Sequence, residues 1–386
     1  MPSWFKLLLF GLFLSSIPTW LRVTTAGRAV QSFAKQAAAE IRFIASSFTA
    51  TTPDDSMSND ASTGRTPVYF LGHGGPNIKE QVMHPAHHIL KRLGKEITTK
   101  VKPKAVVALS AHWQGFQDTI EVNTAESMGL IYDFYGFPAH YYEWKYPNTG
   151  DPALAEKIIG LLRNAGIKAE GVRRGLDHGV WASYSVAFDP ETNPLNVPIV
   201  QVSLFDEENP DLHYALGKAL SSLRDEGVLI ITSGMAVHNL REYGQWAGKQ
   251  GAADYATTFD DALKEAAETP PDSRQQAMAD LLKREDAKKA HPTFEHLLPV
   301  HVAAGAASEE RGKQIWTLPE GSMSWAQYRF GEVGKSATFS TPNSYRAYTL
   351  GSMPIASRTM IGVCGLFFFI VGYARAYLED IALAQR

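Results

Sequence analysis

The run Pro67-Val-Tyr-Phe-Leu-Gly-His73 is short and almost wholly apolar, and it ends in a histidine. Two further runs share this character, Val106-Val-Ala-Leu-Ser-Ala-His112 and Val228-Leu-Ile-Ile-Thr-Ser-Gly-Met-Ala-Val-His238. Continuous apolar runs of this length are typical of strands buried on both faces of a sheet. We therefore predict three buried strands, each with a histidine just beyond its C-terminal end. Ligands bind at that rim in open α/β sheets, so the three imidazoles indicate a metal centre, a general base or both.

Strand-like runs alternate with helical stretches between Thr66 and about Gly334. The predicted strands are 68–71, 105–110, 119–123, 169–172, 199–204 and 228–232, and the predicted helices are 84–93, 152–165, 212–226, 255–268 and 273–283. Pro152 fits the first turn of a helix after Asp151, and Gly166 fits a helix stop. The alternation predicts an α/β fold: a single domain with a largely parallel central sheet flanked by helices and the active site at the C-terminal rim of the strands.

The composition narrows the possible chemistry. The chain has 386 residues, of which 45% are hydrophobic and 20% charged, so it is long enough to bury a full core. A net charge of -3 without clustered basic residues in the centre gives no reason to expect nucleic acid as a partner. The single cysteine, Cys364, excludes an intramolecular disulfide and a cysteine-rich zinc cage. Metal ligands must therefore come from His, Asp and Glu.

The N-terminal part, residues 1–65, predicts a targeting leader followed by a polar linker. Its first 53 positions carry five basic residues against one acid, Glu40, and are rich in Ser, Thr and Ala. An acid-poor basic leader of this kind resembles an organelle transit peptide and indicates a mitochondrial location. A secretory signal is the alternative, because residues 7–17 form an apolar run after Lys6 and a small-residue cleavage site follows at Thr24-Thr-Ala26.

The C-terminal part, residues 336–386, contains an uncharged apolar segment at 360–374, which lies between Arg358 and Arg375. As a helix, about 15 residues at roughly 1.5 Å each are shorter than a bilayer core of about 30 Å, although arginine side chains extend the reach. The segment predicts either membrane contact, as in a membrane-anchored protein, or a helix that packs against other protein. Residues 66–335 between the two tails are the predicted catalytic domain.

All twelve histidines lie between His73 and His301. His73 is surrounded by glycines, which let backbone and ligand approach closely, and His112 precedes Trp113, which can wall an apolar pocket. His178 and His238 lie in predicted loops, where each can serve as an acid or base.

A third ligand is expected in the segment 291–301. It offers four ligating side chains, and spacing does not choose among them: His291, Glu295, His296 and His301. Three protein ligands would leave coordination positions open, as a catalytic metal requires.

Five motifs occur in the order seen in one enzyme family. They are Gly72-His73-Gly-Gly-Pro76, Ser110-Ala-His112-Trp113, Leu176-Asp-His178-Gly179, Ser233-Gly-Met-Ala-Val-His238-Asn-Leu240 and the run from His291 to Ala306. In these motifs the chain resembles the class III extradiol ring-cleavage dioxygenases of the LigB-like superfamily, specifically the DOPA-dioxygenase-type branch. The resemblance spans about residues 67–333.

The resemblance implies a mononuclear non-haem Fe(II) site and insertion of both atoms of O₂ into a catechol ring, with a ring-opened semialdehyde as product. Carried over by motif, the metal ligands are His73, His112 and His296. His238 is then the acid/base, and His178 helps to bind substrate or oxygen. Relatives outside this branch use a glutamate as third ligand, which leaves Glu295 as the substitute for His296. Zn²⁺ also suits three neutral ligands and is a second possible occupant.

Two other functions remain open from the sequence. One is a zinc hydrolase that uses the same histidines to activate water, although an HExxH motif is absent and Glu295 is the only carboxylate base nearby. The other is a non-catalytic, membrane-tethered binding protein, which the apolar tail alone supports.

The aromatic-rich stretch 131–144 is a predicted loop that can line a pocket for an aromatic ring, although most of its aromatic side chains are expected to pack.

Overall fold

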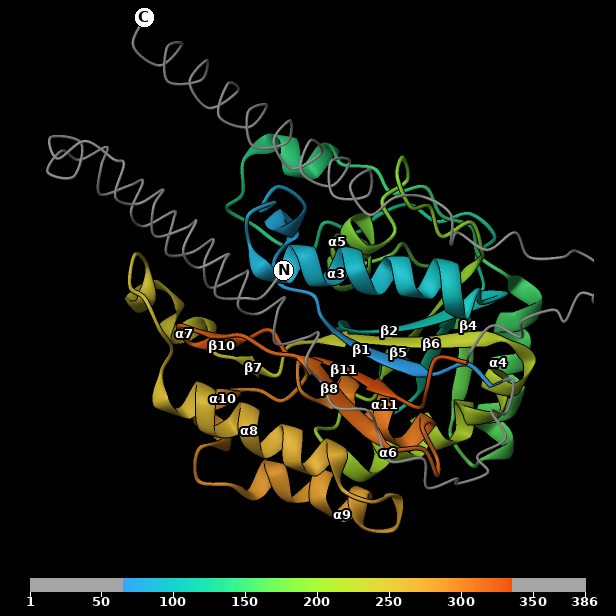
Figure 1. Cartoon of the computed structure of the whole chain (residues 1–386). Coiled ribbons are helices and arrows are strands. Elements are labelled where there is room, and N and C mark those ends of the chain that lie inside the picture. The colour runs from blue at the N-terminus through green and yellow to red at the C-terminus, as the bar shows by residue number, and fades with distance from the viewer. Residues whose placement is uncertain (1–64, 335–386) are drawn as a thin grey trace, which may run out of the picture. The chain divides into compact units, whose positions relative to one another are not determined.

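The apolar runs that lead to His73 and His112 form two strands of an eight-stranded sheet, one on each side of the strand formed by the third run (Figure 1). The structure is a computed structural model that describes residues 65–334. The strand order is β4-β3-β5-β2-β6-β1-β11-β8. The strands of this sheet are β1 (Val68–Gly72), β2 (Ala105–Gln114), β3 (Ile120–Asn123), β4 (Ala169–Val172), β5 (Ile199–Leu204), β6 (Val228–Gly234), β8 (Gly312–Trp316) and β11 (Gln327–Phe330).

The centre of the sheet is parallel. β6 pairs in parallel with both β1 and β2, and β2 pairs in parallel with β5. Parallel pairing brings the C-terminal ends of β1, β2 and β6 to one edge. The predicted single α/β domain with a largely parallel, helix-flanked sheet is therefore confirmed.

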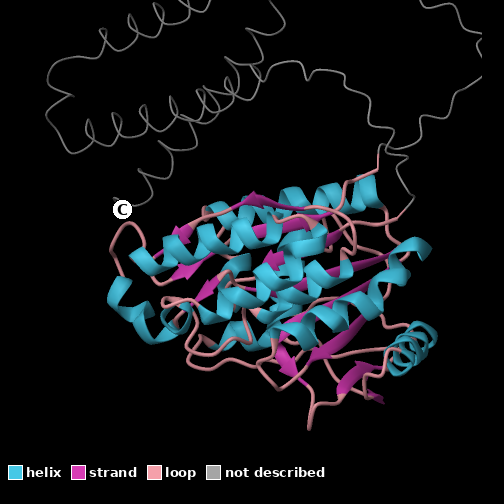
Figure 2. Cartoon of the chain, turned by 90° about the horizontal axis from the view of Figure 1, so that it is seen from below, coloured by secondary structure: helices cyan, strands magenta, loops and turns pink. Residues whose placement is uncertain are grey.

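Alternate residues of the central strands face two different cores. In β1, Val68 and Phe70 lie in one apolar cluster, whereas Tyr69 and Leu71 lie in the other. All five residues of β1 are buried, which explains why its sequence is apolar without alternation. Figure 1 shows α3 and α5 over one face of the sheet and α6, α8 and α9 on the other. Figure 2, from below, shows this second helical layer in front of the strands.

The predicted helices are present with shifts at their ends, the largest in the predicted helix 212–226, where the α-helix ends at Leu220 and a 3-10 helix covers 221–226. The α-helices are α3 (Pro85–Glu96), α4 (Pro152–Asn164), α5 (His178–Ala187), α6 (Pro210–Leu220), α7 (Leu240–Tyr243), α8 (Asp254–Glu268), α9 (Pro271–Asp280), α10 (Ala287–Ala290) and α11 (Leu298–Ala306). Asp151 caps α4 by accepting a hydrogen bond from the backbone N–H of Leu154 at 3.0 Å. Gly166 follows that helix with a φ of 79°, in the left-handed region that glycine favours.

Two helices and several strands differ from the sequence-based expectation. α5 and α11 are buried along their whole length, so they have no polar face that would reveal a helical period. The antiparallel strands β11 and β8, which close one edge of the sheet, were not expected either. A second sheet of three short strands also forms, in the order β7 (Val237–His238), β10 (Met323–Ser324) and β9 (Pro319–Glu320).

Two fully buried histidines at the contact of α6 with α11 make the fold sensitive to acid. Burial lowers the pKa of His213 and of His301 from the ordinary value of 6.5 to about 4. Above pH 7 both residues are neutral in the folded and unfolded chain. As the pH falls below 6.5, the unfolded chain binds protons that the folded chain excludes, so stability is lost toward pH 4. At pH 5 the expected cost is about 2 kcal/mol for each histidine.

Urea unfolding at pH 7.5 and pH 5 measures this loss. Other groups also titrate in this window, so the informative comparison is between variants. His213→Gln should show a smaller loss of unfolding free energy between the two pH values than the wild-type chain. Equal losses in the two proteins would contradict the assignment.

The predicted leader and linker up to Arg65 and the apolar segment 360–374 lie outside the described residues, apart from Arg65 itself. Within residues 65–334, no helix has the length and apolar character needed to cross a bilayer.

Candidate metal centre

His73 lies directly after β1, where the parallel ladder with β6 ends. Its backbone N–H donates to the carbonyl of Gly234 at 3.1 Å, which holds the residue at the rim of the sheet, and the residue is 1% exposed. The following residue, Gly74, has a φ of 64°, and a Cβ there would lie 2.2 Å from the ring of Trp325. A glycine is therefore required beside this histidine.

His112 lies within β2, not beyond its end as predicted. The strand continues to Gln114, but its pairing with β6 ends at Ser110 and its register with β5 shifts after Leu109. His112 thus lies past the end of the ladder with β6, in the irregular stretch between Leu109 and Gln114 of the pairing with β5.

Trp113 points to the other face of β2, because successive side chains of a strand alternate. Its ring stacks against the Arg174 guanidinium at 4.5 Å, and its indole N–H donates to Glu121 at 2.8 Å. Trp113 therefore does not wall a pocket beside His112, contrary to the interpretation of the sequence.

The segment 291–301 contributes one ring to the site, that of His296. The backbone carbonyl of His296 accepts a hydrogen bond from the N–H of Met235 at 2.9 Å, which ties the segment to the end of β6. His291 instead hydrogen-bonds the carbonyl of Ala236 at 2.8 Å, and His301 that of Met278 at 2.9 Å. These two histidines are structural.

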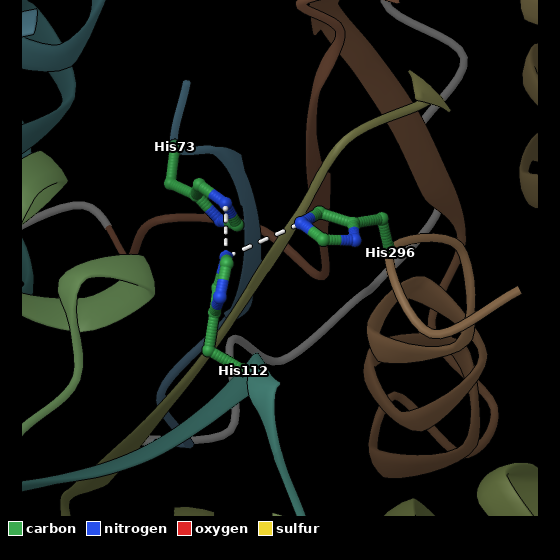
Figure 3. A group of neighbouring side chains, drawn as sticks. All are labelled: His73, His112 and His296. Carbon is green, nitrogen blue, oxygen red and sulfur yellow. Dashed lines mark hydrogen bonds between the residues drawn. The ribbon is translucent and has the colours of Figure 1, made fainter. Parts of the chain in front are cut away.

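The rings of His73, His112 and His296 point toward one another, and dashed lines join the ring of His112 to each of the other two (Figure 3). The Nε2 atom of His112 lies 3.2 Å from Nε2 of His73 and 3.2 Å from Nε2 of His296. Two nitrogens bound to one ion at about 2.0–2.1 Å are expected to lie roughly 2.8–3.4 Å apart at octahedral or tetrahedral angles. The three nitrogens therefore have the spacing of a metal site.

Each of these rings has a hydrogen-bond acceptor at its other nitrogen. Nδ1 of His112 lies 3.1 Å from a carboxylate oxygen of Asp133, and Nδ1 of His296 lies 2.8 Å from Glu295. Nδ1 of His73 lies 3.2 Å from the Ser233 hydroxyl, whose own proton goes to the carbonyl of Gly179 at 2.5 Å. All three Nδ1 atoms therefore carry the proton, as is usual for metal-bound histidines.

This assignment leaves three facing Nε2 atoms that bear lone pairs and no proton. Such atoms repel one another at 3.2 Å unless a cation lies among them. Burial lowers the pKa of His73 and of His296 well below the ordinary value, and the neighbouring histidines act in the same direction. Both rings are thus neutral and able to ligate, and the donor set fits a divalent transition metal.

His178 begins α5 beside His112, and the two ring centroids are 4.0 Å apart. Its Nδ1 lies 2.8 Å from Asp133, and its backbone N–H donates to the same carboxylate oxygen at 3.0 Å. Burial lowers the pKa of His178, although the hydrogen bond to Asp133 opposes this effect. The next residue must be glycine, because a Cβ on Gly179 would lie 2.2 Å from the Ser110 hydroxyl.

His238 lies in β7 of the second sheet, four residues after β6 ends, and not directly beyond the buried strand as predicted. Its ring stacks on that of His296, with centroids 3.5 Å apart and planes inclined by 14°. The side chain keeps some exposure, but desolvation lowers its pKa to about 3, and nearby His291 acts in the same direction. All five histidines predicted for the site are therefore brought together.

The sequence interpretation missed the acceptors that orient these rings. Asp133 and Ser233 were not singled out, and Glu295 was considered only as a ligand. Burial alone would raise the pKa of the Asp133 carboxyl group. Hydrogen bonds from His112 and His178 outweigh this effect, so the pKa lies below its ordinary value. An acid inside the aromatic stretch 131–144 is the one sequence signal that could have indicated this role.

Three rings of the aromatic stretch, those of Tyr132, Phe134 and Trp144, pack at about 6 Å from the ring of Trp181 on α5, in keeping with the expectation that most of its aromatic side chains pack. The Phe134 ring meets His178 edge-on at 5.5 Å and Trp181 at 6.0 Å, so it lies beside the histidine cluster. Tyr135 is 93% exposed and does not line a pocket beside the histidine cluster.

Comparison with known proteins finds relatives that share most of the described part of the chain. A family model described as the catalytic LigB subunit of aromatic ring-opening dioxygenase matches residues 65–330. The 4,5-DOPA dioxygenase extradiol of Beta vulgaris is 37% identical over 267 residues, covering 68% of this chain and 96% of the relative. The protein of that name from Escherichia coli is 32% identical over 276 residues, covering 70% and 96%. A solved structure of an uncharacterized Escherichia coli K12 protein matches with a TM-score of 0.55 and 29% identity, covering 69% of this chain and 100% of that one.

Proposed function

The chain belongs to the family of the catalytic LigB subunit of aromatic ring-opening dioxygenases, and from this membership we propose that it cleaves a DOPA-type catechol with Fe(II) as its metal. It is an extradiol ring-cleavage dioxygenase of the DOPA-dioxygenase branch, which acts on an aromatic substrate and O₂. The observation that carries the proposal is the convergence of three Nε2 atoms, each on a ring whose Nδ1 faces a hydrogen-bond acceptor.

We assign His73, His112 and His296 as the metal ligands. Three neutral nitrogen ligands would leave coordination positions open for both substrates, and Fe(II) bound there would supply the electron transfer between catechol and O₂ that zinc does not. Zn²⁺ suits the same donors, so zinc in a purified sample would occupy the site without supporting turnover. Glu295 is a partner of His296 in this assignment, because its carboxylate contacts Nδ1 of that ring at 2.8 Å.

His238 is the proposed general base. Burial lowers the pKa of His238 to about 3, which leaves the ring neutral at physiological pH but makes it a weaker base than a solvated imidazole. Transfer of a catechol proton to this ring therefore requires the acidification of the hydroxyl that binding to a divalent metal would supply. The His238 ring stacks on the ring of His296, which keeps it beside a proposed metal ligand without making it a ligand itself. The resulting imidazolium can return the proton later in the reaction.

His178 is the proposed substrate-binding or oxygen-binding residue. Its Nδ1–H is bound by Asp133, and among the described residues its Nε2 has no hydrogen-bond partner. That nitrogen is therefore available to accept a hydrogen bond from the second hydroxyl. Phe134, edge-on to the same ring, supplies an apolar contact for the aromatic substrate.

Oxygen uptake tests the proposal. Anaerobic loading of the full chain with Fe(II), followed by air and a catechol panel that includes DOPA, should consume O₂ and give a yellow ring-opened product. Zinc-loaded protein is the matched control and should consume none. Absence of uptake with every catechol would contradict the proposed substrate class.

A further inference from the structure

One carboxylate, that of Asp133, connects a proposed metal ligand to a proposed substrate-binding histidine. One of its oxygens lies 3.1 Å from Nδ1 of His112. The other lies 2.8 Å from Nδ1 of His178 and accepts the backbone N–H of His178 at 3.0 Å. The three groups come from three separate parts of the chain: β2, the loop after β3 and the start of α5.

A carboxylate only accepts hydrogen bonds, so it requires a proton on the nitrogen that faces it. Asp133 therefore requires Nδ1–H in both rings at once. The remaining nitrogen, Nε2, is then unprotonated in both. For His112 this is the nitrogen that faces His73 and His296.

We propose that Asp133 is a positioning residue that sets the tautomers of His112 and His178 together, so that one ring can bind the metal while the other accepts a hydrogen bond from substrate. The inference rests on the ligand role proposed for His112. It adds a residue for which nothing in the sequence motifs indicates a function, and it makes metal binding and substrate binding depend on a single carboxylate.

Asparagine at this position has a specific expected effect. An amide has one accepting oxygen and one donating NH₂ group, so it cannot accept from both rings. The backbone N–H of His178 is a donor that no tautomer change can remove, and it therefore holds the amide oxygen on its side. The NH₂ group then faces His112 and favours the tautomer with the proton on Nε2. That tautomer cannot bind metal through Nε2.

Asp133→Asn should consequently weaken metal binding more than Asp133→Ala. Both substitutions remove the negative charge, but the Asp133 side chain is 22% exposed, so water can enter the space left by alanine and accept from His112. A role in packing alone predicts the reverse order, because asparagine has nearly the shape of aspartate. Glu295→Gln is the matched control: that carboxylate meets one ring nitrogen only, and its amide oxygen can still accept from His296.

The experiment measures Zn²⁺ affinity of the full chain by competition with a chelator, with metal stoichiometry and metal-free thermal unfolding alongside. The expected loss for Asp133→Asn is about 10- to 100-fold, the range for partners of metal-bound histidines, with smaller losses for Asp133→Ala and Glu295→Gln. In ¹⁵N-histidine spectra of the metal-free protein, the substitution to asparagine should move the proton of one ring, His112, from Nδ1 to Nε2, and leave His178 unchanged.

Three results would overturn the inference: unchanged affinity in Asp133→Asn, a larger loss in Asp133→Ala, or two ions bound per wild-type chain with one lost in either variant. The last result would make Asp133 a ligand of a second ion. If His112→Ala also leaves affinity unchanged, the proposed metal site itself is wrong, which separates its failure from that of the tautomer role.

Discussion

His296→Ala is expected to lose its metal and all measurable dioxygenase activity. The substitution removes one of three nitrogen donors and leaves Glu295 without its ring partner. Removal of a metal ligand should lower the metal affinity by more than the roughly 10- to 100-fold that follows when a hydrogen-bond partner of a ligand is removed. The measurement is metal content per chain after dialysis, together with affinity by chelator competition.

A histidine outside the cluster provides the control for this variant. His140 is 52% exposed at its side chain and pairs with Glu80, away from the three converging rings. His140→Ala should keep wild-type metal content. The assignment would be wrong if His296→Ala bound metal normally while Glu295→Ala lost it, because the glutamate would then be the third ligand.

The central strands could be predicted from the sequence because burial on both faces leaves a direct mark, a continuous apolar run. The same burial hides a helix. All ten residues of α5 and all nine of α11 are buried, so neither has the polar face that reveals a helical period. Antiparallel β11 could not be predicted for a different reason: its pairing with β1 joins positions about 260 residues apart, such as Val68 and Phe330.

The site shows a similar division. The five histidines could be identified because they follow strand-like runs or stand in motifs that resemble those of a known family. The choice of His296 over its neighbours depends on how the backbone of 291–298 turns, which spacing does not encode. The hydrogen bond from His178 to Asp133 spans 45 positions, and Asp133 lies in a loop without a periodic pattern. Residues that orient a site through such long-range contacts leave little local signal.

His238→Ala is expected to keep one metal ion per chain and to lose turnover. The His238 ring stacks on His296 at 3.5 Å but is not one of the three converging nitrogens, so metal affinity should change little. Loss of a general base costs about 10²- to 10⁴-fold in rate. Steady-state oxygen uptake by the iron-loaded variant, with metal content measured on the same sample, tests both expectations.

His238→Gln separates proton transfer from hydrogen bonding at this position. Glutamine can still hydrogen-bond a catechol hydroxyl but does not accept its proton near neutral pH, so its kcat should fall as far as that of His238→Ala while KM changes less. If His238→Gln keeps most of the wild-type kcat, His238 binds the substrate but does not act as the general base. Loss of metal from His238→Ala together with its retention in His296→Ala would reverse the two roles, since the ring that holds the ion would then be the one contributed by β7.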